Sequence, residues 1–420
     1  MAKPTTTSKS LIIIGGSWGG ISLSHYLLKH VLPHLNKTSP SSYELILISS
    51  STEAFCRPAC PRALISDSLL PQDKLFVSIP SLFTQYSPPS TFRFLHATAT
   101  SLNTSSRTLT ITSHSPSPHE PTITTLPYHA LVIATGASTP SPLLGLSSGI
   151  DTTSLRASWA SFRAALPSAK RIVISGGGPS GVEVAGELAE HLNGAMPRSW
   201  LSLPPARTDP KVEIVLVTAA KRILPDLRES LAQRAETYLA ALGVKVVKGV
   251  RVEGVVPSGK GEGVVLKLGS GERMEADLYV PCVGTTPNTG FVEDKGLLGE
   301  DGRVVTNEGT LRVDKVGGEG RVYAIGDASN FAKPGVHNTL SAVPVLGTNM
   351  KKDLAGGQGE DKIFVEDTRE TQLVPIGRSK GVGAMKGWWL PSCAVWLIKG
   401  RDYWLWTTGD VWSGKAWAKE

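Results

Sequence analysis

The stretch that decides the fold spans residues 170–192 and reads KRIVISGGGPSGVEVAGELAEHL. It begins with an apolar run of strand length, passes through a glycine turn, and continues with apolar residues at helical spacing. Gly176, Gly178 and Gly181 satisfy the G-x-G-x-x-G pattern. Such glycines permit a tight turn, close approach of the backbone to phosphate, and close packing of the helix on the strand. With the apolar run KVEIVLVT at 211–218, the stretch predicts a strand–turn–helix–strand unit that binds a dinucleotide.

A second unit of the same kind lies near the N-terminus. SLIIIG at 10–15 runs into the turn GGSWGG, and YELILIS at 43–49 reads as the next strand. Gly15 and Gly20 are in place, whereas Ser17 stands where the middle glycine is expected, and its hydroxyl can donate to a phosphate. One glycine turn alone is weak evidence, but two in the same context predict two dinucleotide sites.

The composition narrows the class of protein. At roughly 150 residues per domain, 420 residues suggest two or three domains. A hydrophobic fraction of 40% and a charged fraction of 19% exclude a wholly disordered or coiled-coil chain. Four cysteines do not make a disulfide scaffold, so we expect a reducing, cytoplasmic location, with peripheral attachment to a mitochondrial or other internal membrane as an extension. No metal site is predicted, because no residues have the spacing of metal ligands.

The last fifty residues have a composition of their own. Residues 371–420 contain seven of the ten Trp and carry seven basic against three acidic side chains, in a chain of net charge +7. The stretch WWLPSCAVWLIKGRDYWLW at 388–406 fits strands whose Trp residues are core, or a membrane or dimer surface, and both can coexist on alternate faces of one strand. We expect no nucleic-acid partner, because no dense Lys/Arg run is present.

Further motifs add a family resemblance. ALVIATG at 130–136 and VYAIGDAS at 322–329, together with the two glycine turns, resemble the two-dinucleotide-domain flavoproteins that depend on a pyridine nucleotide. CRPACPRALI at 56–65 and the terminal Trp-rich stretch are similar to the fungal branch of the AMID proteins, relatives of apoptosis-inducing factor and the ferroptosis suppressor.

The resemblance implies an α/β fold with two Rossmann-like domains of the glutathione-reductase kind and a short C-terminal β-rich segment. It implies FAD in the first domain and NADPH or NADH in the second. The predicted boundaries are 1–160 and 286–355 for the two parts of the FAD domain, 161–285 for the NAD(P)H domain, and 356–420 for the C-terminal segment.

The resemblance also assigns cofactor contacts residue by residue. The predicted cofactor-binding positions in these motifs are Gly15, Gly16, Ser17, Gly19, Gly20, Ser50, Arg62, Ala134, Thr135, Gly136, Gly176, Gly178, Pro179, Ser180, Gly181, Gly284, Gly326 and Asp327. Lys221 and Arg222 join them on the separate ground of their charge. Asp327 is expected to accept hydrogen bonds from the ribityl chain of the flavin. Arg62 is expected either to face FAD or to be a plain surface arginine. Ser17, and Ser50 in place of a ribose-binding acid, depart from the family pattern.

The residues after the strand at 211–218 bear on the choice of nucleotide. An acid about 20 residues after a glycine turn binds the ribose hydroxyls of NADH. Here the strand ends in Thr218-Ala219-Ala220, followed by Lys221 and Arg222. The missing carboxylate and the two cations favour NADPH, unless both cations only solvate a loop.

The chemistry implied is hydride transfer from NAD(P)H through the flavin to a quinone or similar small acceptor. Glu183 is the predicted catalytic residue, orienting the nicotinamide carboxamide or a proton near flavin N5. The alternative is a first-turn Glu favoured only by the helix dipole. Other hypotheses are a flavoenzyme acting on a secondary-metabolite intermediate, a disulfide reductase using Cys56 and Cys60, and a non-enzymatic apoptosis-related interaction protein. The chain is expected to be a monomer or homodimer.

Overall fold

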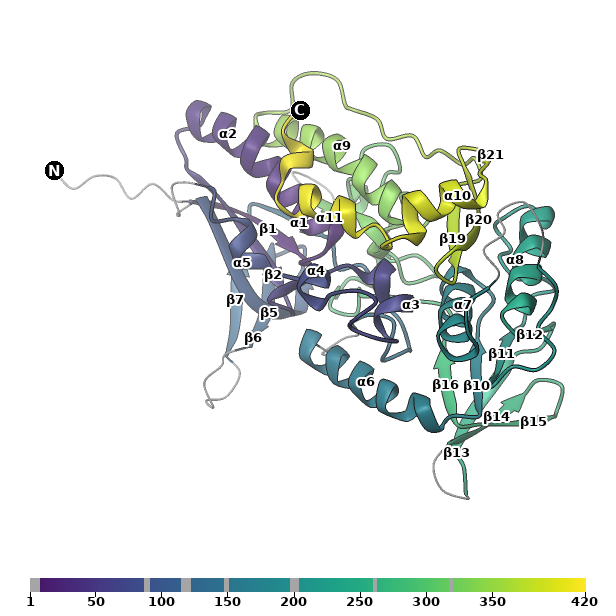
Figure 1. Cartoon of the computed structure of the whole chain (residues 1–420). Coiled ribbons are helices and arrows are strands. Elements are labelled where there is room, and N and C mark those ends of the chain that lie inside the picture. Colours follow the sequence, from purple (N-terminus) through teal and green to yellow (C-terminus); the bar gives the residue numbers. More distant parts are fainter. Residues whose placement is uncertain are drawn as a thin grey trace.

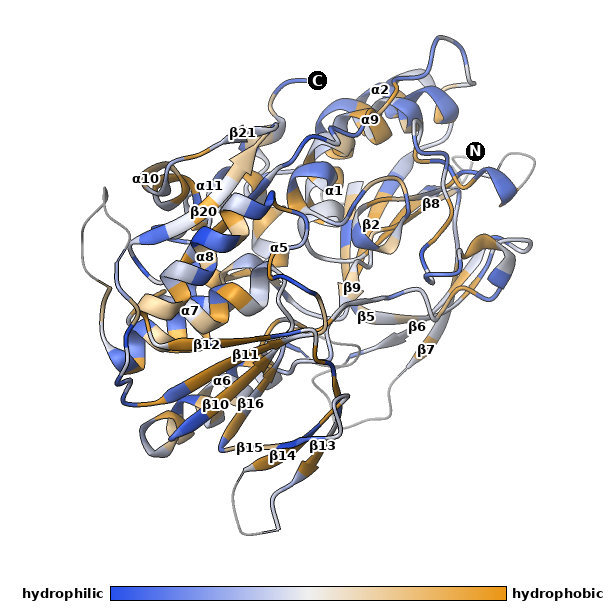
Figure 2. Ribbon diagram, turned by 90° about the vertical axis from the view of Figure 1, so that its right-hand side faces the viewer, coloured by the Kyte–Doolittle hydropathy of each residue, from blue (hydrophilic) through white to orange (hydrophobic). Residues whose placement is uncertain are grey.

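The computed structural model of the chain describes residues 8–86, 91–114, 122–146, 151–196, 204–259, 263–316 and 320–420. Two parallel-rich sheets with helices around them confirm the predicted α/β class (Figure 1). The strands of the second sheet are strongly apolar, as expected for parallel strands that are covered on both faces (Figure 2).

The first sheet has seven strands in the order β18-β8-β1-β2-β5-β6-β7. The first five of these pair in parallel, and β6 and β7 continue the sheet as antiparallel strands. Its strands are β1 (Lys9–Ile14), β2 (Tyr43–Ser49), β5 (Phe92–Asn103), β6 (Thr108–Ser113), β7 (Ile123–Pro127), β8 (Ala130–Ile133) and β18 (Val322–Ala324). The chain therefore returns to the first sheet after some 190 intervening residues, as the two-part FAD domain requires.

The second sheet is fully parallel, in the order β12-β11-β10-β16. Its strands are β10 (Arg171–Ser175), β11 (Glu213–Thr218), β12 (Val244–Lys248) and β16 (Leu278–Pro281). An antiparallel sheet of β13 (Val252–Pro257), β14 (Val264–Leu268) and β15 (Arg273–Ala276) packs against it. Two small pairs join β3 (Glu53–Phe55) with β4 (Phe76–Ser78), and β9 (Ala137–Ser138) with β17 (Thr286–Pro287). The domain boundaries remain a prediction.

The helices follow the strands as the βαβ pattern predicts. Each glycine turn leads directly into a helix: α1 (Trp18–Tyr26) after β1, and α7 (Pro179–Asn193) after β10. The others are α2 (Leu32–Thr38), α3 (Cys60–Ala63), α4 (Gln72–Leu75), α5 (Ile79–Leu82), α6 (Thr152–Ala165), α8 (Glu229–Ala241) and α9 (Val336–Leu354). A π-helical turn, Leu27–Val31, joins α1 to α2.

The C-terminal segment begins as β-structure and ends as helix. A three-stranded sheet of β19 (Gln372–Ile376), β20 (Lys380–Met385) and β21 (Trp388–Trp389) confirms the β-rich part. The expectation of strands through 388–406 is wrong beyond Trp389. There the chain forms α10 (Ser392–Val395), a π-helical turn (Trp396–Gly400) and α11 (Leu405–Trp412). The physical reason is that the buried residues of α11 recur at helical spacing and pack on α1.

Candidate functional site

The two glycine turns have the same internal geometry. A Cβ added to Gly15 would lie 2.2 Å from the carbonyl oxygen of Ala134, and one on Gly20 would lie 1.8 Å from that of Gly15. In the second turn, a Cβ on Gly176 would lie 2.2 Å from the oxygen of Cys282, and one on Gly181 1.9 Å from that of Gly176. Only glycine fits these four positions, because helix and strand approach too closely for any side chain.

Both turns have room and free donors for a dinucleotide. Gly178 caps α7, and an added Cβ there would meet no atom within 4 Å. Ser17 caps α1, is exposed, and makes no side-chain capping bond, so its hydroxyl is available to a phosphate. Trp18 Nε1 is buried without a hydrogen-bond partner among the described residues. The residues present therefore fit two pyrophosphate-binding turns.

The remaining FAD motifs gather around the first turn. Asn288 holds the Ala134–Gly136 strand end: its Nδ2 donates to the Thr135 oxygen at 2.9 Å, and Thr135 Oγ1 donates to the Asn288 oxygen at 2.7 Å. Gly326 begins a 3₁₀ turn that carries Asp327. The Thr339 side chain of α9 lies near the first glycine turn and near this 3₁₀ turn. It is 3.2 Å from a Cβ built on Gly19 and 3.6 Å from one built on Gly326. The first glycine turn, the Ala134–Gly136 strand end and the Gly326–Asp327 turn thus lie together, although each contact with FAD remains a prediction.

The residues after β2 show which side chains stand near the position where the family has a ribose-binding acid. Ser50 is exposed at the strand end, and its backbone oxygen accepts from His96. Glu53, the next acid along the chain, is paired with Arg156 at 3.0 Å. Burial alone would raise the pKa of Glu53, but its hydrogen bonds with Arg156 and Thr152 outweigh burial and leave that pKa below the usual range. Glu53 is thus engaged elsewhere, and Ser50 is the polar residue at this position.

Glu183 is buried on α7, where its Oε1 lies 2.6 Å from Lys399 Nζ of the C-terminal segment. Burial raises the pKa of Glu183 to about 7, against the opposing effect of Lys399. The Lys399 ammonium also donates to the Leu373 oxygen. The sequence did not predict that Lys399 pairs with Glu183, because nothing local connects residues 216 positions apart.

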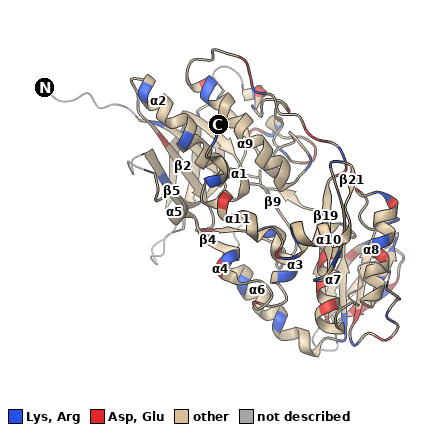
Figure 3. Cartoon of the chain, turned by 45° about the horizontal axis from the view of Figure 1, so that its top comes forward, with Lys and Arg blue, Asp and Glu red and all other residues tan. Residues whose placement is uncertain are grey.

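Two further acids extend this face of α7. Glu187 is buried and accepts from Arg62 at 2.7 Å and from the Tyr403 hydroxyl at 3.0 Å. Glu190 pairs with Arg378 at 3.0 Å. Figure 3 shows acidic residues on α7 beside basic residues of neighbouring elements.

The expectation that Arg62 faces FAD or solvent needs correction. The side chain is buried, and its guanidinium is engaged by the Glu187 carboxylate and the Arg401 backbone oxygen. It also stacks over the Tyr403 ring. We therefore assign Arg62 to this ion-pair cluster and not to phosphate binding.

The loop after β11 carries the predicted nucleotide-selecting cations. Lys221 is exposed, and Arg222 is half-buried and donates to the Pro225 oxygen at 2.6 Å. The Thr218 hydroxyl accepts from the Ala220 backbone, which closes the turn. Gly284, at the end of β16, has a positive φ of 59° and open space beside it. These groups lie at the carboxyl edge of the second sheet, where α/β proteins bind ligands.

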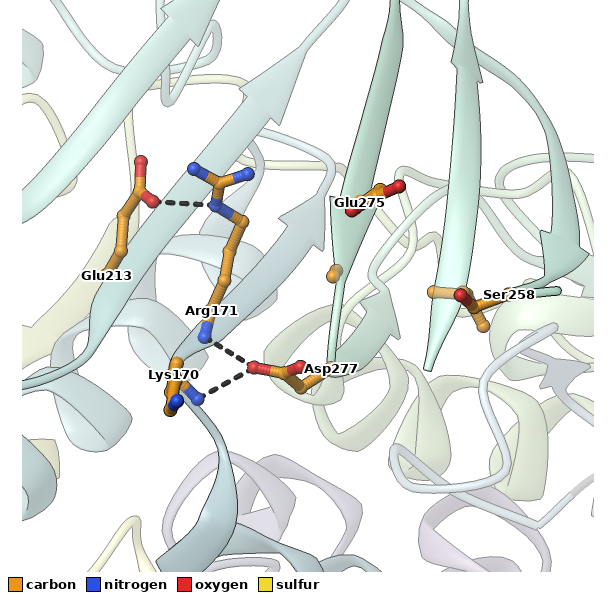
Figure 4. Close-up of a pocket in the computed structure, with 8 residues that line it drawn as sticks. Lys170, Arg171, Glu213, Ser258, Glu275 and Asp277 are labelled. Carbon is orange, nitrogen blue, oxygen red and sulfur yellow. Dashed lines mark hydrogen bonds and ion pairs between the residues drawn. The ribbon is translucent and has the colours of Figure 1, made fainter. Parts of the chain in front are cut away.

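A pocket of about 370 Å³ lies at the opposite edge of the second sheet, where β10 begins (Figure 4). Three of its charged side chains, Arg171, Glu213 and Asp277, are engaged by other groups that line it. The Asp277 carboxylate accepts from the backbone amides of Lys170 and Arg171, and Arg171 pairs with Glu213 at 2.6 Å. This pocket is separated from the second glycine turn by the length of β10.

Comparison of the sequence with models of known protein families shows which family has these two turns. The model of the pyridine nucleotide-disulphide oxidoreductases matches residues 9–345. The chain belongs to this family. It is an NAD(P)H-dependent oxidoreductase with FAD as its resident cofactor.

Relatives agree with the AMID-like resemblance. The oxidoreductase phnG of Penicillium herquei is 54% identical over 432 residues, covering 100% of both chains. Ferroptosis suppressor protein 1 of Xenopus laevis is 28% identical over 249 residues, covering 56% of this chain and 58% of that protein. Among solved structures, an engineered water-forming NADPH oxidase bound to NADPH has a TM-score of 0.64 at 16% identity, covering 89% of this chain and 74% of its own.

The family's name draws attention to the pair Cys56 and Cys60. Both thiols are free and buried in this oxidoreductase. Burial raises the pKa of Cys56 to about 12 and that of Cys60 still further. Thiolate is the reactive form of cysteine, so these thiols are poorly suited to disulfide exchange in this geometry.

His25 on α1 is fully buried, and burial lowers its pKa to about 4. Among the described residues no group of three or more His, Cys, Asp or Glu could hold a metal ion. In the same part of the chain, no helix is both long and apolar enough to cross a bilayer.

Proposed function

We propose that this oxidoreductase passes the hydride of NADPH through FAD to a quinone or a similar small electron acceptor. The observation that carries the proposal is that the C-terminal segment has one buried, charged side and one exposed, apolar side. On its buried side, Lys399 pairs with Glu183 of α7. Its outer side exposes Trp388, Leu397 and Trp406. An apolar acceptor would thus meet an apolar surface on the same segment that holds the charged pair.

When bound, FAD would supply the redox chemistry, namely the uptake of a hydride from the nicotinamide and the release of electrons to the acceptor. The chain's own residues bind and orient. The two glycine turns hold the pyrophosphates against the start of α1 and α7, where unpaired backbone amides favour anions. Glu183 offers its carboxylate to the carboxamide of the nicotinamide, and Lys399 fixes the position of that carboxylate. Burial of the pair excludes water from around these charges.

The choice of NADPH rests on the loop after β11. A 2′-phosphate would find two cations there and no carboxylate to repel it. We expect the double variant Lys221→Ala/Arg222→Ala to lower kcat/KM for NADPH roughly tenfold, the equivalent of about 1.4 kcal/mol, and to leave NADH turnover unchanged. Lys248→Ala, which removes a cation paired with Glu236 at the end of the neighbouring strand, is the matched control. An equal loss of kcat/KM for NADPH and for NADH in the double variant would contradict the role of these two cations in selecting NADPH.

The acceptor is tested by steady-state oxidation of NADPH with a water-soluble ubiquinone analogue or an aromatic disulfide. We expect turnover with the quinone, slowed in Lys399→Met. The double variant Cys56→Ser/Cys60→Ser should retain quinone turnover. Turnover with the disulfide alone, lost in the double cysteine variant, would overturn the quinone proposal in favour of a disulfide reductase.

The exposed aromatic residues support a peripheral membrane surface as the entrance for such an acceptor. Trp388 is 78% and Trp406 55% exposed, and Arg401 stacks over Trp406. Trp prefers the bilayer interface, and cations prefer anionic headgroups. We expect co-sedimentation with anionic vesicles that weakens in Trp388→Ser/Trp406→Ser. Equal recovery of both proteins in the vesicle-free fraction would contradict a membrane surface.

A further inference from the structure

The last helix of the chain packs on the helix that follows the FAD turn. Trp18 is the first residue of α1, and its ring lies 4.5 Å, centroid to centroid, from that of Trp412 at the end of α11. Both side chains are buried. The C-terminal segment therefore touches the very turn that the pyrophosphate of FAD would occupy, although nearly 400 residues separate the two in the chain.

Three basic side chains of the first helical region fasten this contact. His25 lies with Nε2 2.7 Å from the Trp412 oxygen, His30 with Nε2 2.9 Å from the Trp417 oxygen, and Lys29 donates to the Gly414 oxygen. The last carbonyls of a helix have no partner within it. The first helical region thus caps the end of α11 and the turn after it from outside.

His25 is held in one orientation by partners on both sides. With its Nε2 proton donated to the Trp412 oxygen, its Nδ1 accepts from the Tyr86 hydroxyl at 2.6 Å. Gly414 packs against the imidazole ring: its φ is +75°, and an added Cβ would lie 2.6 Å from Nδ1. A side chain at position 414 would therefore force the two segments apart.

We propose that docking of residues 405–417 on α1 is thermodynamically coupled to FAD binding, with the docked segment holding Trp18 and the start of α1 in the conformation that receives the pyrophosphate. Coupling between two binding events is reciprocal. If docking strengthens FAD binding by a given factor, bound FAD must therefore strengthen docking by the same factor. This coupling does not depend on which acceptor the enzyme uses.

A purely structural role for the contact makes a different prediction. A segment that only adds stability would destabilise the whole protein when released, with FAD bound or absent, and would leave FAD affinity unchanged. The two readouts that separate these cases are FAD release and local opening of the segment.

Gly414→Ala tests the coupling, with Gly409→Ala as the matched control. Gly409 lies in α11, in the same docked segment as Gly414, which follows the end of that helix, and an added Cβ on Gly409 meets no atom within 4 Å. FAD release is followed by the rise in flavin fluorescence on dilution of the holoenzyme. We expect Gly414→Ala to weaken FAD binding roughly tenfold, within the usual range of coupling between sites, and Gly409→Ala to leave it unchanged.

The reciprocal arm uses limited trypsin digestion at Lys415, an exposed residue of the segment. Added FAD should slow cleavage in the wild type by a factor similar to the loss of FAD affinity, and should have no such effect in Gly414→Ala. If Gly414→Ala does not fold, Trp412→Phe replaces it, with the exposed Trp406→Phe as control. Faster cleavage with unchanged FAD release, or protection by FAD that is equal in wild type and variant, would overturn the proposal.

Discussion

At the scale of residues, the face of α7 that carries Glu183, Glu187 and Glu190 is the most informative feature. These acids lie on one side of the helix, and each has its own cation: Lys399, Arg62 and Arg378. The sequence predicted a role for Glu183 from its place after the glycine turn. It could not predict the cations, because they come from segments far away in the chain and no local pattern records a long-range ion pair.

Glu183 makes stability depend on pH. Its pKa of about 7 lies above the ordinary value of 4.5, so the folded protein binds this proton more tightly than the unfolded chain. The resulting stabilisation is present below pH 4.5 and is lost as the pH rises through 7. Between pH 5 and 7.5 we expect the free energy of unfolding of the wild type to fall by about 2–3 kcal/mol relative to the neutral pair Glu183→Gln/Lys399→Met. Urea unfolding at both pH values measures this, and parallel pH profiles would contradict it.

Arg62 and Glu187 form a buried pair whose disruption is costly. Removing one partner leaves an uncompensated buried charge, so Arg62→Leu should lower the free energy of unfolding by about 3–5 kcal/mol. The double variant Arg62→Leu/Glu187→Leu should recover most of the loss, because neither charge remains. Lys248→Leu breaks a more exposed pair and serves as the control. A double variant as unstable as the single one would show that packing, and not charge, dominates here.

At the scale of elements, the strand–turn–helix units were predictable and the C-terminal helices were not. The glycine turns are local patterns, and close backbone packing fixes their residues. In 388–406, the Trp-rich composition fitted strands with core Trp residues or a membrane or dimer surface. The signal for α11 was nevertheless present, since Leu405, Thr408, Val411 and Trp412 recur at helical spacing and are buried. Trp404 precedes that helix at a φ of +70°, a conformation that sequence patterns rarely reveal for Trp.

Two glycines of the second turn should respond differently to the same substitution. Gly181→Ala places a Cβ 1.9 Å from the Gly176 oxygen, so it should destabilise the NAD(P)H half of the protein. Gly178→Ala meets no protein atom, and its φ of −75° suits alanine, so folding should be unchanged. The added methyl would instead obstruct the approach of phosphate, and KM for NADPH should rise roughly tenfold.

Thermal unfolding and NADPH kinetics, measured side by side, check both expectations. The flavin content of Gly178→Ala should equal that of the wild type, since the FAD turn is untouched. Unchanged KM in Gly178→Ala, or wild-type stability in Gly181→Ala, would mean that the second turn does not approach a nucleotide as its geometry indicates.

At the scale of the whole molecule, the C-terminal segment connects the two nucleotide-binding halves. In Figure 1 it crosses from the neighbourhood of α8 and α7 to that of α1. It pairs with α7 through Lys399 and Arg378 and with α1 through Trp412. One segment thus contacts both helices that begin at a glycine turn. A shift of this segment would therefore change the packing of α1 and of α7.

The measurement that tests the account most directly is an anaerobic flavin titration of the purified protein. NADPH should bleach the flavin absorbance, and a ubiquinone analogue added afterwards should restore it within the time of a few turnovers. A protein that cannot be loaded with FAD, or one whose bleached flavin is reoxidised by a disulfide and not by the quinone, would contradict the account.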